Sequence, residues 1–384
     1  MAQPRYKDTG GGSCFGEYLY QQMVPRDHPL RALKNLFDWE ELAGELIRLY
    51  QGRGLVGRPP YDPVLMFKVL FVSYLYELSE RDTEVWANEN IPAHYFLDLA
   101  LDVRAPDHST VSLFKQRLVS GRNWEPLSRI FDGLLQQARA RGLELGSIQV
   151  VDSVHTQADV NHEKDRERQD KHHPPRDPDA RVVNKGERKV VEPGGQEVTK
   201  TVRYQGFKSH ASVNVPTGIT TSVLPSLGDS ADNKAFPKLF QHDLSLQLPT
   251  ETYGGDRAYD DTAIYAHIEG HGLHVGIRLQ SGRLNKKDDN KGRWIELVQT
   301  AQYQAATKVR YRVEQVFAQA KDKHGLERCR YLGLVRFGIQ SFLTFMVVNA
   351  KRMMKLLTGI TFRKQAKGRH REILIPVYAS LPWA

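Results

Sequence analysis

The stretch SIQVVDS (147–153) marks the point at which the sequence changes character. Its apolar run is typical of a short β-strand, which we expect to end at Asp152. Up to residue 143 the apolar residues recur at helical spacing, whereas after 147 strand-like and helix-like segments alternate. This pattern predicts a mixed α/β fold in which helices cover a sheet, preceded by an all-helical region.

The segments after 147 predict the order of the elements. KSHASVNVP (208–216) and GITTSVLP (218–225) have the composition of a strand pair joined by a turn. Another extended segment precedes Asp256, and LHVGIRL (273–279) follows a helical segment. The predicted order is strand, strand, strand, helix, strand, helix, strand, helix, and the last helix should begin near Ala305.

The region 19–143 is expected to be an all-helical domain. DPVLMFKVLFVSYLYELS (62–79) is too apolar for a surface helix and should lie at its centre. Asp107 or Ser109 can cap the helix that follows them. Short helices with tight turns are typical of helix-turn-helix DNA-binding domains, although a plain helical bundle has the same pattern. Residues 1–18 are rich in Gly and are expected to be flexible.

The rest of the chain divides into an α/β domain at 144–330 and a C-terminal part at 331–384, which we expect to be a long amphipathic helix with a basic tail. Within the α/β domain, residues from about 160 to 203 are dense in charge, Pro and Gly, and they predict a solvated insertion. The histidines of this insertion match no standard metal cage. The cationic run at 351–371 contains no acid and suits phosphate contacts.

The charge and the cysteine content limit the class of protein. The 384-residue chain has a formal net charge of +9, which favours a polyanionic partner such as DNA or RNA. A basic enzyme without a nucleic-acid partner is the alternative. Cys14 and Cys329 are too few for a disulfide framework or a zinc cluster. The N-terminal residues have no apolar signal core and no apolar run is long enough to span a bilayer, so a cytoplasmic location is expected.

Three carboxylates follow predicted strands. Asp152 ends the first strand, Asp256 follows the fourth, and Glu314 lies on the helix after the fifth. If the first and fourth strands are neighbours, the two aspartates meet at one end of the sheet and the glutamate helix can cross that end. Converging carboxylates repel one another, and divalent cations relieve the repulsion. Two Mg²⁺ ions can activate an attacking oxygen and stabilise the leaving oxygen of a phosphodiester, although each carboxylate alone could be structural.

The stretch VRYRVEQVFAQAKDKHG (309–325) carries the third carboxylate. On an α-helix, Arg310, Glu314 and Lys321 fall within about 40° of one another, beside a separate apolar stripe. This arrangement fits either a salt-bridged surface patch or one edge of an active site.

Several motifs resemble those of the DDE transposases of bacterial insertion sequences. The matching segments are GRPPYDPVLMFKVLF, YLYELSERD and APDHSTVSLFKQRL in the helical region, then Asp152, YQGFKSHASVNVPTGI (204–219), DRAYD (256–260), and the spacing Arg310-x3-Glu314-x6-Lys321. The last element resembles the Arg, Glu and Lys of the family's Tyr-Arg-Glu-Lys signature. The resemblance extends over residues 24–357, and the signature's tyrosine is replaced by Thr307.

The resemblance implies an RNase H-like mixed sheet flanked by helices, with an N-terminal all-helical DNA-binding domain. It implies that Asp152, Asp256 and Glu314 are catalytic and hold two Mg²⁺ or Mn²⁺ ions. It also implies that Arg310 and Lys321 contact DNA phosphate. Further candidates for DNA contacts are Arg257, Lys208, Lys351 and Arg352.

Two polar residues near these motifs have other expected roles. Asp232 is expected to cap a helix, although a place near the metal ions is the alternative. His210 is placed in a strand and is expected to pack or to contact DNA.

The function that the resemblance implies is that of a DNA transposase of an insertion sequence. Such an enzyme binds terminal inverted repeats, cleaves the ends by metal-dependent hydrolysis and joins the 3′-OH ends to target DNA. A homodimer in the synaptic complex, a nucleoid-associated location and no membrane contact are expected with it. The alternatives are an RNase H-like metal-dependent nuclease that does not join DNA, and a domesticated DNA-binding protein.

Overall fold

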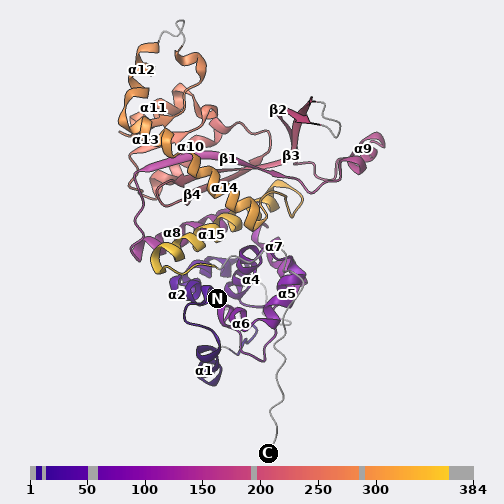
Figure 1. Cartoon of the computed structure of the whole chain (residues 1–384). Coiled ribbons are helices and arrows are strands. Elements are labelled where there is room, and N and C mark those ends of the chain that lie inside the picture. Colours follow the sequence, from indigo (N-terminus) through magenta and orange to yellow (C-terminus); the bar gives the residue numbers. More distant parts are fainter. Residues whose placement is uncertain (1–5, 11–13, 51–58, 192–196, 285–289, 363–384) are drawn as a thin grey trace, which may run out of the picture.

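The computed structural model describes residues 6–10, 14–50, 59–191, 197–284 and 290–362. Figure 1 shows a sheet with helices packed on it in one half of the molecule and a cluster of short helices in the other half. The long helix α15 (Leu334–Thr358) lies between the two halves. The predicted mixed α/β fold with an N-terminal helical region is therefore confirmed.

The N-terminal half consists of short helices. They are α1 (Cys14–Met23), α2 (Pro29–Leu36), α3 (Trp39–Ala43), η1 (Gly44–Tyr50), α4 (Pro63–Leu75), α5 (Glu80–Glu89), α6 (Ile91–Leu97), α7 (His108–Leu118) and α8 (Glu125–Ala140). Tyr20 of α1 and Val24, directly after the helix, pack against Tyr95. Residues 14–18, which we expected to be flexible, form the first turns of α1, and 1–5 and 11–13 lie outside the described residues.

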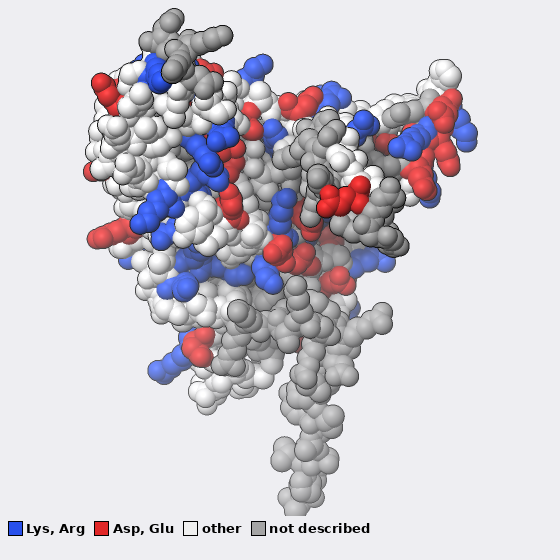
Figure 2. All heavy atoms as spheres, turned by 45° about the horizontal axis from the view of Figure 1, so that its top comes forward, with Lys and Arg blue, Asp and Glu red and all other residues white. Residues whose placement is uncertain are grey.

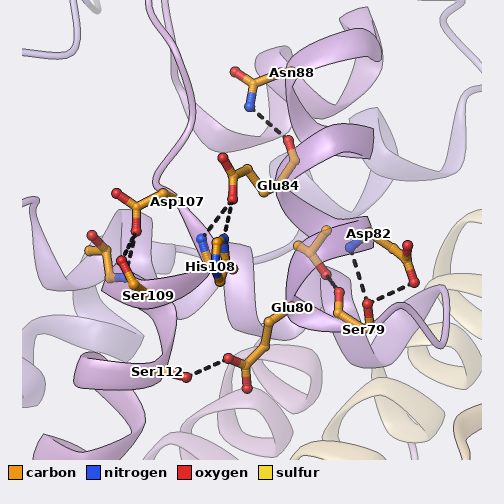
Figure 3. Close-up of polar contacts among 11 residues, drawn as sticks. Ser79, Glu80, Asp82, Glu84, Asn88, Asp107, His108, Ser109 and Ser112 are labelled. Carbon is orange, nitrogen blue, oxygen red and sulfur yellow. Dashed lines mark hydrogen bonds and ion pairs between the residues drawn. The ribbon is translucent and has the colours of Figure 1, made fainter.

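Short polar side chains hold α5 and α7 together (Figure 3). Asp107 caps α7, since its Oδ1 accepts a hydrogen bond from the backbone N of Thr110 at 2.7 Å. Ser109, the other capping candidate, donates its hydroxyl to Asp107 at 2.5 Å instead. Glu84 of α5 accepts from the backbone N of His108 at 2.9 Å, and its Oε2 lies 2.7 Å from Nδ1 of the same residue. The first turn of α7 is thus fixed to the middle of α5.

Helix α4 is the buried centre of the helical half, as its apolar sequence predicted. Every residue from Pro63 to Leu75 is buried. Asp62 begins the helix by accepting a hydrogen bond from the backbone N of Val64 at 2.7 Å. Helix α4 packs on α15, so the helical half is continuous with the α/β half.

The sheet has the strand order of an RNase H-like core. Its strands are β1 (Ile148–Gln157), β2 (Arg181–Val191), β3 (Glu197–Asn214), β4 (Ile219–Leu227), β5 (Thr252–Gly255) and β6 (His274–Ile277). β5 and β6 run parallel to β1 on one side, while β3 pairs antiparallel to β1 on the other and β4 pairs antiparallel to β3. The predicted strand pair and the predicted neighbourhood of the first strand and the strand before Asp256 are both present.

Strand β1 is longer than its apolar run suggested. Asp152 pairs with Ala211 in the middle of the β1–β3 ladder, which continues to the pair between Gln157 and Gly206. The prediction that the strand ends at Asp152 is therefore wrong. The polar residues after Asp152 stay in the strand because β3 provides backbone partners for them.

The charged segment from about 160 to 203 is not a plain solvated loop. It contains α9 (His162–Asp170), β2 and the first part of β3, and β2 pairs antiparallel with β3. Figure 1 shows β2 and α9 projecting from one side of the molecule. The predicted insertion is present, but much of it is regular structure.

The remaining helices pack around the sheet. They are α10 (Asp232–Ser245), η2 (Arg257–Tyr259), α11 (Thr262–Gly270), η3 (Ser281–Leu284), α12 (Lys291–Gln299), α13 (Ala301–Val309) and α14 (Tyr311–His324). The single helix predicted from near Ala305 is thus two helices. Arg310 joins them with helical backbone angles (φ −50°, ψ −38°).

Helix α15 is buried on all sides rather than amphipathic, because different layers cover its different faces. All residues from Phe337 to Ala350 are buried, and the helix packs on α4, α8, α14 and strands β3 and β4. A Cβ atom at Gly338 would lie 1.9 Å from Trp124 Nε1, so only glycine allows this close approach. The helical half and part of the α/β half therefore share one hydrophobic core. In the ranges listed above, no helix combines the length and the apolar character needed to span a bilayer.

Candidate active site

Asp152 and Asp256 lie side by side on neighbouring parallel strands. In the register between β1 and β5, Val151 pairs with Gly255, so the next residue on each strand is an aspartate. Asp256 caps η2, since its Oδ1 accepts from the backbone N of Ala258 at 2.9 Å. The glycine before Asp256 packs closely on the ring of Tyr259. Strand pairing and a local cap thus place the two carboxylates at the same end of β5.

Glu314 joins this pair through Arg310. Arg310 Nη2 lies 2.8 Å from Glu314 Oε1, and Arg310 Nη1 lies 3.7 Å from Asp152 Oδ2. The side chain of Asp152 is 17% exposed and that of Glu314 is 58% exposed. Helix α14 therefore presents a solvent-facing carboxylate beside a nearly enclosed one, with one guanidinium between them.

The environment of Asp152 disfavours its ionised form. Burial, together with the charges of Asp256 and Asp232, raises the pKa of Asp152 to about 7. The backbone N–H of Ser153 and the guanidinium of Arg310 act in the opposite direction without cancelling the shift. A carboxyl group that is desolvated among other carboxylates is one that a divalent cation would stabilise as the anion.

The carboxylates do not form a closed metal cage. In the described parts of the chain, no group of three or more His, Cys, Asp or Glu side chains has the arrangement of a metal site. Arg310 lies between Asp152 and Glu314, and its positive charge partly neutralises their negative charges. Mg²⁺ is commonly held by one or two carboxylates together with waters and substrate phosphates, so the adjacent aspartates fit such an ion. Glu314 is exposed enough to turn from Arg310 towards them.

A second carboxylate network lies next to Asp152. Asp232 Oδ1 lies 3.0 Å from Lys208 Nζ and 3.4 Å from His210 Nδ1, and no side-chain cap bond is found at the start of α10. The prediction that Asp232 caps a helix is therefore wrong. Lys208 is buried, and its amine also donates to the backbone O of Ser230 at 2.8 Å. Lys208 thus forms an internal ion pair rather than the exposed DNA contact that we expected.

His210 belongs to the same network. It is fully buried, and its Nε2 lies 2.9 Å from Ser226 Oγ. Burial lowers the pKa of His210 to about 4, against the opposing charge of Asp232. Its packing role was one of the two expected alternatives. The sequence offered no signal that Lys208, His210 and Asp232 meet, because the contact joins a strand to the start of a helix.

The other expected DNA contacts differ in their exposure. Arg257 is exposed directly after Asp256, and Lys321 is partly exposed two turns beyond Glu314 on α14. Lys351 Nζ lies 3.4 Å from His324 Nε2, and Arg352 donates to Gln319 Oε1 at 3.1 Å. The basic residues after 362 lie outside the described residues. Figure 2 shows positive and negative side chains interspersed on the face viewed, rather than one uniformly basic surface.

The position of the signature tyrosine carries an exposed Thr307 on α13. Tyr303 cannot replace it at the surface, because its ring is buried and its hydroxyl accepts from the backbone N of Leu279 at 3.3 Å. Tyr311 is half exposed at the first position of α14. It is the tyrosine on this pair of helices whose ring can reach a ligand at the surface.

Comparisons with known families and structures agree with the motifs. Residues 18–117 match the family model described as a transposase domain (DUF772), and residues 146–350 match the model described as a transposase DDE domain. The second match alone spans more than half of the chain. A solved piggyBac transposase synaptic complex with hairpin DNA is similar over 86% of this chain and 75% of that chain, at 11% identity and a TM-score of 0.42. A likeness this low carries no argument about the site.

Proposed function

The chain belongs to the DDE transposases, and on that premise we propose that it is the transposase of an insertion sequence, which cuts and joins DNA at Asp152, Asp256 and Glu314. The observation that carries the proposal is the pairing of the two aspartates across β1 and β5, with Glu314 linked to Asp152 through Arg310. Each carboxylate comes from a different part of the chain, and the sheet and α14 bring them to one place.

Asp152, Asp256 and Glu314 would hold two Mg²⁺ or Mn²⁺ ions. When bound, such ions activate the attacking oxygen and stabilise the leaving oxygen of the phosphodiester. Movement of Glu314 away from Arg310 would release a guanidinium at the edge of the site. Arg310 would then donate to a DNA phosphate oxygen, a contact that suits its planar donor geometry. Lys321, on the same helix edge, would supply a second positive charge along the strand.

The two proposed reactions are in-line displacements at phosphorus. In the first, water attacks the phosphorus at the end of the element, the bond to the 3′ oxygen breaks, and a free 3′-OH remains. In the second, that hydroxyl attacks a phosphodiester of the target, a new phosphodiester forms and the target's own 3′ oxygen leaves. Each step is an in-line attack on a phosphodiester phosphorus in which a 3′ oxygen leaves, so one set of carboxylates can serve both.

The helical half would bind the terminal inverted repeats, and the synaptic complex would be a homodimer that holds two ends. Arg257 would add a phosphate contact beside Asp256, and Lys351 and Arg352 would add phosphate contacts on α15. A cellular location at the nucleoid follows from this DNA partner. The excess of positive charge supports DNA binding but gives no repeat sequence.

Incubation with flanking DNA tests the proposal against a nuclease that only cleaves. DNA from either side of the gene, a supercoiled target plasmid and Mg²⁺ should yield both nicked ends and joined products in which the element's strand is covalently linked to plasmid. Both products should disappear with EDTA. Cleavage without joining would favour the nuclease, and binding without either product would favour a domesticated DNA-binding protein.

A further inference from the structure

A groove beside the start of α14 contains side chains that the carboxylate site does not use. It has a volume of about 360 Å³ and is lined by the turn between β3 and β4 (215–218) and by Tyr311, Arg312, Gln315 and Arg352. It lies on a polar surface, since two guanidinium groups and the backbone of a tight turn face it. A groove of this composition is suited to an anion with an attached ring.

Arg352 is a desolvated cation without an acidic partner. Its Nη2 donates to the amide oxygen of Gln319 at 3.1 Å, its Nε is buried without a hydrogen-bond partner, and no ion pair with a carboxylate is found for it within the described ranges. Burial lowers the pKa of Arg352. Placing a charge in such surroundings is unfavourable unless an opposite charge is supplied, and here the open side is the groove.

The turn between β3 and β4 is shaped to admit this guanidinium. Gly218 has a φ of +69°, and a Cβ atom there would lie 2.0 Å from Arg352 Nη1. A larger residue would therefore push the guanidinium out of its place. The turn is held by the backbone N of Gly218, which donates to the backbone O of Asn214 at 2.7 Å.

The groove and the proposed active-site edge lie on opposite flanks of α14. At about 100° per residue, Arg312 points about 160° away from Arg310 and Glu314, and Tyr311 falls between these two sides. Tyr311 is 51% exposed and Arg312 is exposed. A strand bound at the carboxylates therefore meets the ring of Tyr311 before it reaches the two arginines.

We propose that this groove binds a nucleotide of DNA on the other side of α14 from the one that is cut, an inference that rests on the proposed function. Arg352 and Arg312 hold the phosphate of that nucleotide, and the ring of Tyr311 stacks on its base. The guanidinium group of an arginine can donate two hydrogen bonds to phosphate oxygens, and the ring of a tyrosine can stack on any base. The contact is therefore independent of the DNA sequence. Tyr311 thereby supplies an aromatic contact one turn after Thr307.

The inference is tested by measuring the binding of a labelled DNA duplex of random sequence by fluorescence anisotropy in EDTA. Affinity should be measured across a salt series from about 50 to 200 mM for wild type, Arg312→Gln, Arg352→Gln, Tyr311→Ala and Tyr311→Phe. Lys323→Gln is the matched charge control. Lys323 is exposed on the same helix as Arg312 and lies about 16 Å from it along the helix axis.

Each arginine variant should lower the slope of log K against log salt by about 1, because one phosphate contact is lost. Tyr311→Ala should weaken binding roughly 5- to 100-fold with no change of slope, and Tyr311→Phe should bind like wild type, because stacking needs only the ring. Lys323→Gln should keep the wild-type slope.

The possible failures are distinguishable. A wild-type chain that does not bind DNA would overturn the proposed function itself. A wild-type chain that binds, with groove variants no different from Lys323→Gln, would overturn the groove alone. Arg352 is partly buried, so circular dichroism of each variant checks folding. Should Arg352→Gln fail to fold, the exposed residues Arg312 and Tyr311 still decide the matter.

Discussion

Asp152→Asn should make the metal-free protein more stable and remove DNA cleavage. Burial raises the pKa of Asp152 to about 7, whereas an unfolded aspartate titrates near 3.9. A folded-state pKa above the unfolded one means that stability is lost as the pH rises from about 4 through 7. Asparagine carries no charge to desolvate, so the variant should gain on the order of 2–4 kcal/mol at pH 8 and little at pH 4.

Urea unfolding in EDTA at pH 8 and pH 4 measures this gain. Asp261→Asn is the matched control, because Asp261 caps α11 from a partly exposed position and asparagine caps equally well. An Asp152→Asn variant that is less stable than wild type at pH 8 would contradict the account of the site as a cluster of poorly compensated carboxylates.

Addition of Mg²⁺ should narrow the difference in stability between the two proteins at pH 8. An ion that binds the folded chain stabilises it by about 1.4 kcal/mol at tenfold excess over the dissociation constant. Wild type should gain this stability at pH 8, whereas Asp152→Asn should not. Cleavage by the variant should fall by at least about 10³-fold, since each tenfold loss corresponds to 1.36 kcal/mol and a metal supplies several kcal/mol.

Acidification should destabilise the protein through His324. This residue at the end of α14 is fully buried, and its Nδ1 lies 2.9 Å from the backbone O of Tyr74 in α4. Burial, together with Lys351, lowers the pKa of His324 to about 3. Because the folded pKa lies below the unfolded value near 6.5, this stability is complete above about pH 6.5 and is lost as the pH falls towards 3.

The contribution of His324 is measured as a difference between variants. The free energy of unfolding of wild type should drop by about 2 kcal/mol relative to His324→Gln between pH 7.5 and pH 5. His271→Gln, at an exposed histidine, is the control and should follow wild type. The comparison cancels the opposite trend from Asp152. Parallel pH profiles for wild type and His324→Gln would contradict the buried, neutral state of this ring.

The elements that were predictable from the sequence carry strong local patterns. The apolar run before Asp152, the strand pair after 208 and the fully apolar helix α4 could each be read without knowledge of their neighbours. The three carboxylates stand out in the sequence because each belongs to a motif in a fixed order along the chain, and their joint role stays a proposal. The closeness of Asp152 and Asp256 needed only that two strands be adjacent.

The features that the sequence did not predict depend on distant partners. The charged strand β2 has no clear apolar alternation, and only its pairing with β3 makes it a strand. Asp232 stands where a helix cap is common, but the buried amine of Lys208 takes its side chain instead. Helix α15 has polar residues at several positions, yet layers from both halves of the molecule bury all its faces from Phe337 to Ala350.

Single-turnover cleavage by carboxylate-to-amide variants tests the central claim most directly. Asp152→Asn, Asp256→Asn, Glu314→Gln and the control Asp261→Asn would be compared on flanking DNA with Mg²⁺, and DNA binding would be measured in parallel. The first three should each lose at least about 10³-fold in rate while still binding DNA, and the control should cleave like wild type. Cleavage that survives in Asp152→Asn, Asp256→Asn or Glu314→Gln would contradict the assignment of that residue to the catalytic site.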